Sequence, residues 1–164
     1  MVRSLPTLSS MALVALAFCE PPHSHAASLL IGINDNDQTG LCLDVKAADV
    51  SSGTGQVGAF TCNLTAAQKW NFEGSTIEGL GTTSQGPFCL DVFDNGTFDG
   101  TPVDITRCNG TTAQIWTYDN QGAIVGERSG KCLTVPFDTP LPHPVIIQTC
   151  GVPFREHNQV WTVR

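Results

Sequence analysis

Cysteine is the residue type in this sequence that most clearly indicates a kind of chemistry. The chain of 164 residues contains seven cysteines, and six of them lie beyond residue 40. No Cys-x-x-Cys pair and no cluster of cysteine with histidine has the spacing of a zinc site. An even number of cysteines in an exported chain is typical of a disulfide framework. We therefore predict disulfides, with no metal site and no cofactor.

Groups that could catalyse a reaction are few. Beyond the first 30 residues the chain has two histidines, His143 and His157, and it lacks the Gly-x-Ser-x-Gly turn of serine hydrolases. Asp91 and Asp94 resemble the carboxylate pair of a glycosidase, but they fall on a turn outside any evident cleft. His143 lies among three prolines, which indicates a rigid loop rather than a catalytic base. We expect no enzymatic activity.

The charge balance narrows the classes of partner. The net charge is -7 at pH 7, from 8 Lys and Arg against 15 Asp and Glu. Binding to nucleic acids and to anionic lipid surfaces depends on basic side chains, so neither partner is expected. Charged residues make up 14% and hydrophobic residues 41% of the chain, which favours a folded domain over a disordered one.

The N-terminus is typical of a secretory signal peptide. Arg3 supplies a positive charge, residues 11–18 are apolar, and small residues follow at Ala26 and Ala27. A run of eight apolar residues is too short to span a bilayer, which takes about 20 residues. We predict a signal peptide over 1–27, with a cut after Cys19 as the alternative, and a secreted, extracellular protein without membrane insertion.

An internal repeat determines the predicted fold. Gln-x-Trp occurs three times, ending at Trp70, Trp116 and Trp161, and these are all the tryptophans in the chain. Cys-Leu-Asp-Val or Cys-Leu-Thr-Val lies upstream of each, and each unit has a second cysteine. A fourth element, an apolar run that ends in glycine, follows the first two units. After the third unit it is missing, and it occurs instead at 29–32.

These elements add up to twelve strands in three pseudo-symmetric repeats. We predict an all-β fold, a β-trefoil, over 28–164 in which the N-terminal strand completes the third repeat. The repeats cover about 40–80, 87–126 and 130–164 together with 28–33. A β-propeller has blades of similar length, but three blades are too few to close a ring. The tryptophans Trp70, Trp116 and Trp161 are expected in the core.

Repeat symmetry also predicts the disulfides. Six cysteines allow fifteen pairings. The pairing that treats the three units alike joins Cys42 to Cys62, Cys89 to Cys108 and Cys132 to Cys150.

With these motifs in order, the chain resembles the ricin B-type lectin family over about 28–164. The third unit departs from the pattern, because three residues are inserted between Cys150 and Trp161. The resemblance implies sugar binding in shallow pockets, up to one per repeat. In such a pocket a carboxylate accepts hydrogen bonds from sugar hydroxyls, an aromatic ring covers the C–H face of the sugar, and amides complete the recognition.

Transferred residue by residue, the family pattern is incomplete in every repeat. The first repeat offers the carboxylate of Asp44, the ring of Phe60 and the amide of Gln68, although Gly58 and Ala67 replace two polar side chains. We rank it as the best site.

The other two repeats match the pattern less well. The second has Asp91 and Asp104 but Thr106 at the aromatic position, and we expect a weaker site there. The third has Asn158, while Thr134 replaces the aspartate, so a site there is doubtful. The aspartates could instead bond local amides in turns, and the glutamines of Gln-x-Trp could serve the backbone alone.

Three Asn-x-Thr sequons begin at Asn63, Asn95 and Asn109 and are potential N-glycosylation sites. The leading interpretation of the whole chain is a secreted lectin that binds glycans or glycoconjugates carrying galactose-type or related sugars. The alternative is a β-trefoil with degenerate sugar sites that acts through protein contacts, such as a protease inhibitor or a defence protein. An exposed loop at 136–144 would then carry the activity.

Overall fold

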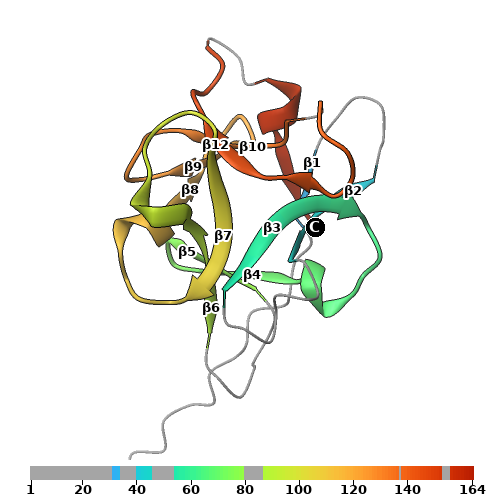
Figure 1. Ribbon diagram of the computed structural model, residues 1–164, viewed down its shortest axis with the longest axis horizontal. Coiled ribbons are helices and arrows are strands. Elements are labelled where there is room, and N and C mark those ends of the chain that lie inside the picture. Colours follow the sequence, from blue (N-terminus) through green and yellow to red (C-terminus); the bar gives the residue numbers. More distant parts are fainter. Residues whose placement is uncertain (1–30, 34–39, 46–53, 80–86, 137, 153–155) are drawn as a thin grey trace, which may run out of the picture.

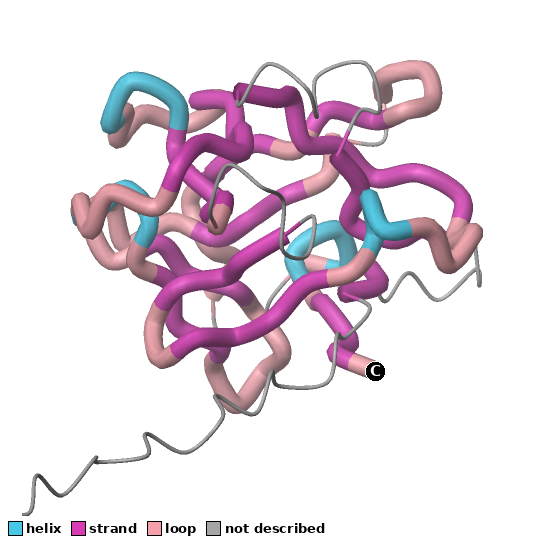
Figure 2. Tube along the Cα trace, turned by 90° about the horizontal axis from the view of Figure 1, so that it is seen from below, coloured by secondary structure: helices cyan, strands magenta, loops and turns pink. Residues whose placement is uncertain are grey.

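The computed structural model describes residues 31–33, 40–45, 54–79, 87–136, 138–152 and 156–164. The predicted signal peptide lies outside the described residues, as do the first residues of the predicted domain. Strands and four single-turn 3-10 helices make up the regular structure of the described ranges (Figure 2). None of the helices in these ranges is long and apolar enough to cross a membrane.

The chain folds as a β-trefoil, as the repeats predict. The first repeat comprises β2 (Leu41–Val45), β3 (Thr54–Thr61), β4 (Trp70–Glu73) and β5 (Thr76–Gly79). The second comprises β6 (Phe88–Val92), β7 (Thr101–Arg107), β8 (Trp116–Tyr118) and β9 (Ile124–Gly126). The third comprises β10 (Cys132–Thr134), β11 (His143–Pro144), β12 (Ile146–Gln148), β13 (Trp161–Val163) and β1 (Ile31–Ile33).

The second strands of the three repeats meet around the pseudo-threefold axis. β3 pairs with β7, β7 pairs with β12, and β11 pairs with β3, so each repeat is hydrogen-bonded to both others (Figure 1). Between β11 and β12 the chain changes partner at Val145, whose N–H donates to Val57 and whose carbonyl accepts from Val103. This change divides one predicted strand into two and explains the presence of thirteen strands instead of twelve.

The N-terminal strand completes the third repeat, as predicted. β1 pairs antiparallel with β13 on one side and with β2 on the other. The pairing of β1 with β13 is shifted by one residue from the register expected when Gly32 is aligned with Gly79 of the first repeat. Trp70 lies opposite Gly79, but Trp161 lies opposite Ile33 and not opposite Gly32. Ile33 is only 7% exposed, so this register buries its side chain in the core.

The three tryptophans lie in one hydrophobic core, each at most 3% exposed. Their indole N–H groups donate to the carbonyls of Leu43, Leu90 and Leu133, at 3.0, 2.9 and 2.9 Å. Each of these leucines belongs to the Cys-Leu string of the same repeat. The two sequence motifs are therefore tied together inside the core, and the polar atom of each indole is satisfied.

One disulfide closes each repeat. The bonds join Cys42 to Cys62, Cys89 to Cys108 and Cys132 to Cys150, with sequence separations of 20, 19 and 18 residues. This is the pairing that treats the repeats alike. Three disulfides in so small a domain are typical of an oxidising compartment.

Candidate functional site

Before each tryptophan a 3-10 turn ends in a glutamine that is at most 1% exposed: η1 (Ala66–Gln68), η3 (Thr112–Gln114) and η4 (His157–Gln159). In the first repeat, Oε1 of Gln68 accepts a hydrogen bond from the N–H of Asn63 at 2.7 Å, and Nε2 donates to the carbonyl of Thr61 at 2.9 Å. Gln114 makes the equivalent bonds with Asn109 and Arg107, and Gln159 makes them with Gly151 and Thr149.

The same glutamines also hydrogen-bond to the third residue of the Cys-Leu motif in their own repeat. The Gln68 side chain hydrogen-bonds to Asp44, and the Gln114 side chain hydrogen-bonds to Asp91. Sequence comparison assigned Gln68 to the sugar-contacting set. Because Gln68 is fully buried and its amide is occupied by the backbone and by Asp44, its place in the structure is behind the carboxylate, where it fixes the position of Asp44.

A cavity of about 480 Å³ opens beside Asp44 and Phe60 of the first repeat. We call this region, and its equivalents around Asp91 and Thr134, the corner of each repeat. Its polar edge includes Asp44 and Asn63, and the ring of Phe60 lines it as well. In the antiparallel pair of β2 and β3, Asp44 lies opposite Gly58, two residues from Phe60. Side chains two residues apart on a strand share a face, so the carboxylate and the ring project to the same side of the sheet.

Burial and a hydrogen bond act in opposite directions on the Asp44 carboxyl. Asp44 is half-buried, and burial raises the pKa of its carboxyl, while the hydrogen bond from Gln68 opposes the rise. Phe60 is 37% exposed although it is a large apolar residue. A partly desolvated carboxylate next to an exposed ring can hold hydroxyl groups at one edge of a ligand and an apolar face at the other.

Part of the cavity wall comes from the third repeat, which the sequence comparison did not reveal. Pro142, His143 and Pro144 line the cavity opposite the first-repeat residues. The signal in the sequence is Gly58, which stands where the family pattern has a polar side chain. A Cβ atom at position 58 would lie 2.8 Å from the carbonyl oxygen of His143, so the close approach of β11 requires glycine there.

The second repeat brings two carboxylates together without a ring. Asp91 and Asp104 lie directly opposite each other on β6 and β7, and Thr106 occupies the position equivalent to Phe60. Asp91 is only 8% exposed. Burial and then the charge of Asp91 raise the pKa of Asp104 to about 6, and one of the Asp104 oxygens is buried without a hydrogen-bond partner. Asp91, the equivalent of Asp44, is therefore more deeply buried than Asp44.

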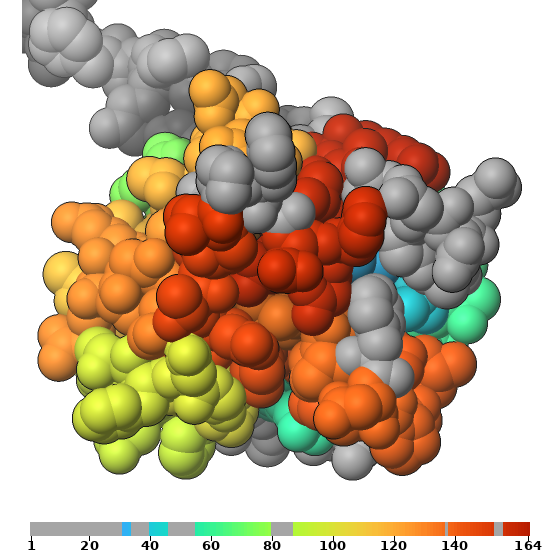
Figure 3. Space-filling view, turned by 90° about the horizontal axis from the view of Figure 1, so that it is seen from above, coloured from blue at the N-terminus to red at the C-terminus, as the bar shows by residue number. Residues whose placement is uncertain are grey.

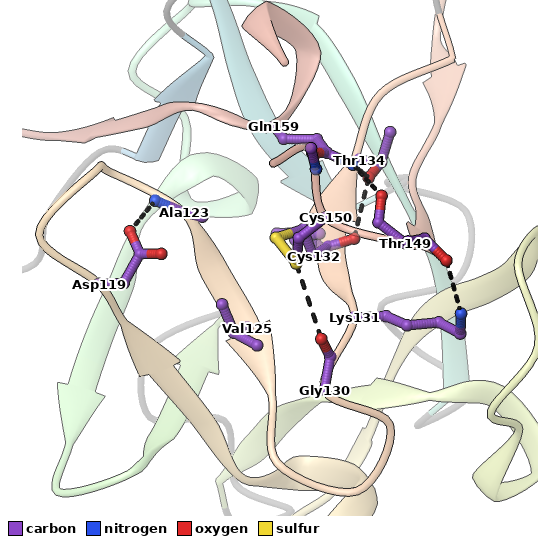
Figure 4. The surroundings of a disulfide bond; sticks show 12 residues. Asp119, Ala123, Val125, Gly130, Lys131, Cys132, Thr134, Thr149, Cys150 and Gln159 are labelled. Atoms are coloured by element: carbon purple, nitrogen blue, oxygen red, sulfur yellow. Dashed lines mark hydrogen bonds between the residues drawn. A yellow bond between two sulfur atoms is a disulfide. The ribbon is translucent and has the colours of Figure 1, made fainter. Parts of the chain in front are cut away.

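In the third repeat, Thr134 stands at the position that Asp44 and Asp91 occupy in the other two. Thr134 is fully buried; it donates to the carbonyl of Cys132 at 2.9 Å and accepts from Nε2 of Gln159 at 3.1 Å (Figure 4). Nδ2 of Asn158, the residue that sequence comparison assigned to a doubtful site, donates to the carbonyl of Val135 at 3.2 Å. These polar groups serve the backbone of the repeat.

The sequon asparagines are all exposed. Oδ1 of Asn63 accepts from the N–H and the hydroxyl of Thr65, and Oδ1 of Asn109 accepts from the N–H of Thr111. Asn95 lies in η2 (Phe93–Asn95). Of the three, Asn63 borders the cavity.

Within the described ranges, Glu78, Cys89 and Cys108 form a group whose ligand-type atoms lie close together. The two cysteines are joined in a disulfide, so they offer no thiolate to a metal ion.

The family of ricin-type β-trefoil lectin domains matches residues 32–163. The chain belongs to this family. Among curated proteins, the probable lipoprotein EnvE of Salmonella typhimurium strain LT2 is 32% identical over 126 residues, which cover 72% of this chain and 65% of that protein. The ribosome-inactivating protein SNAI' of Sambucus nigra is 40% identical over 47 residues, which cover 29% of this chain and 8% of that protein. The lectin domain thus spans less than two thirds of either relative.

Solved structures share the trefoil of this lectin domain. The agglutinin from Abrus precatorius superposes with a TM-score of 0.67 at 24% identity, covering 85% of this chain and 49% of that one. The C-terminal half of the earthworm R-type lectin, in complex with GalNAc, gives 0.65 at 10% identity and covers 85% and 98%. The designed threefold-symmetric protein ThreeFoil gives 0.67 at 22% identity and covers 83% and 96%. At these identities the likeness concerns the fold.

Proposed function

We propose that this protein is a secreted lectin that binds galactose-type or related sugars through the first repeat, without catalysing a reaction on them. Asp44 accepts hydrogen bonds from neighbouring sugar hydroxyls, Phe60 stacks on the C–H face of the sugar, and Asn63 adds polar contacts at the rim. Gln68 positions the carboxylate from behind. Glycans and glycoconjugates are the partners.

The observation that carries this proposal is the cavity that contains both Asp44 and Phe60. Membership of the ricin-type lectin family supports carbohydrate binding in general, and a GalNAc complex among the structural neighbours supports a galactose-type ligand. Asp91 and Asp104 form a weaker second site, because the second corner lacks the ring. Asn158 contributes no site of its own, since it bonds to the backbone.

The predicted signal peptide over 1–27 and the three disulfides support the proposal of export. The relative EnvE is named as a probable lipoprotein, which makes lipid attachment at Cys19 the competing mode of export. Mass spectrometry of the N-terminus of the exported protein separates the two. A new N-terminus near residue 28 supports secretion, whereas an acylated Cys19 would contradict it. The same spectra report whether Asn63, Asn95 and Asn109 carry glycans.

A glycan array probed with the oxidised, deglycosylated protein tests the proposed function, with Asp44→Ala probed in parallel. A single monosaccharide pocket of this kind works near the millimolar range, about -4 kcal/mol, so the array must present sugars densely. We expect binding to galactose-terminated glycans that Asp44→Ala loses. A blank array from folded protein would contradict sugar binding and favour a trefoil that acts through protein contacts.

A further inference from the structure

The third repeat is fixed against the sugar cavity by backbone pairing. Pro144 of β11 lies opposite Gly58 of β3, and the N–H of Val145 donates to the carbonyl of Val57 at 3.2 Å. In the space-filling view, orange atoms of the third repeat lie against teal atoms of the first (Figure 3). The segment 142–144 is therefore a fixed wall of the cavity and not a loop that happens to lie near it.

Gly58 makes this wall possible. A Cβ atom at that position would lie 2.8 Å from the carbonyl oxygen of His143 and 3.6 Å from the Cβ atom of Pro142. A side chain at position 58 would therefore force the wall away from β3. In the first repeat, therefore, Gly58 replaces a hydrogen-bonding side chain, and the segment 142–144 of the third repeat packs in the space that this leaves.

The cavity is larger than one sugar ring and has two chemically different parts. Its volume of about 480 Å³ lies within the range of about 300–1,000 Å³ that is typical of pockets for drug-sized ligands. A single hexose is smaller than a ligand of that size. Asp44 and Asn63 form the polar edge, while Pro142 and Pro144 form the apolar side opposite them. Pockets of this size commonly combine apolar walls with a few polar groups that fix orientation.

We propose that the cavity selects galactose-type sugars that carry an apolar extension in the form of an aryl aglycone. The sugar hydroxyls bind Asp44, the ring stacks on Phe60, and the extension packs against Pro142 and Pro144. This inference rests on the proposed function and specifies the ligand class of the same site. The two proline rings are the residues that determine the specificity.

Calorimetric titration of the purified, oxidised protein with methyl β-galactoside and with 4-nitrophenyl β-galactoside tests the inference. Extra apolar contact in a pocket is worth about tenfold in affinity or more, so we expect the aryl glycoside to bind about ten times more tightly. Equal affinities would overturn the inference and leave sugar binding in place. Binding of neither ligand would overturn the proposed function together with the inference.

The variant Pro144→Ser removes one ring of the wall, and Pro140→Ser is the matched control. Pro140 is exposed in the same segment and does not line the cavity. We expect Pro144→Ser to bring the affinity ratio of the two ligands close to one and Pro140→Ser to keep the tenfold ratio. If Pro144→Ser does not fold, Pro142→Ser removes the other ring of the wall and is interpreted in the same way. A tenfold ratio that survives in the folded wall variant would overturn the role of the wall.

Discussion

Replacing Gln68 by alanine removes the support of the proposed site while leaving its surface residues in place. The substitution deletes the acceptor of the Asn63 N–H, at 2.7 Å, and the donor to the carbonyl of Thr61, at 2.9 Å. A buried backbone group that loses its partner costs about 1–3 kcal/mol, and these two partly buried groups fall at the lower end of that range. With two such groups and a fully buried side chain lost, we expect Gln68→Ala to lower the free energy of unfolding by about 3 kcal/mol.

The equivalent glutamine of the second repeat is a matched control. Gln114 makes the same two bonds, at 2.8 Å to Asn109 and at 3.0 Å to Arg107, and is equally buried. Gln114→Ala should therefore lower the free energy of unfolding by a similar amount. The two variants should differ in sugar binding, because only Gln68 hydrogen-bonds to Asp44.

Urea unfolding with the disulfides intact measures the stability, and titration with methyl β-galactoside measures the affinity. We expect Gln68→Ala to bind the sugar at least tenfold more weakly and Gln114→Ala to bind it like the original protein. The reasoning is refuted if folded Gln68→Ala keeps the original affinity. It is also refuted if both variants lose affinity equally.

Three further predictions concern the stability of the fold. Because the folded-state pKa of Asp104 is about 6, above its usual value of 3.8, the unfavourable charge lowers stability as pH rises from 4 to 7. Asp104→Asn should remove this dependence and raise stability at pH 7 by about 1 kcal/mol once solvent screening is allowed for, as urea unfolding at both pH values would show. A Cβ atom at Gly79 would lie 2.7 Å from the nearest indole ring atom, against 3.4 Å at Gly126, so Gly79→Ala should cost about 2 kcal/mol and Gly126→Ala less than about 1. Equal losses in thermal unfolding would contradict this packing argument. Removing the 20-residue crosslink with Cys42→Ala and Cys62→Ala should cost about 3 kcal/mol, and an unchanged unfolding midpoint would be the opposing result.

The fold could be predicted from the sequence because the recurring Gln-x-Trp and Cys-Leu motifs indicate a threefold symmetry. Three tryptophans at nearly equal spacing imply three equivalent units, and a missing last strand with a spare first strand implies that the ends pair. The register of β1 could not be predicted, because aligning Gly32 with Gly79 and Gly126 places it opposite Trp161, whereas the structure places Ile33 there. Only the pairing of Ile33 with Trp161 fixes it.

The site could be predicted only in part. Asp44 and Phe60 follow from their offsets to the cysteines, since strand register carries those offsets directly into space. The wall from 142–144 could not be predicted, because it depends on a contact between repeats more than 80 residues apart in sequence. Gly58 gave the only signal, and it resembles the loss of a polar contact until the approach of β11 is seen.

The central claim is that the first repeat holds the main sugar site. Amide chemical-shift mapping of the labelled, oxidised protein during titration with galactose tests it most directly. We predict saturable shifts that centre on Asp44, Phe60 and Asn63 and that disappear in Asp44→Ala. Shifts centred on Asp91 and Asp104, or shifts that persist unchanged in folded Asp44→Ala, would contradict the claim.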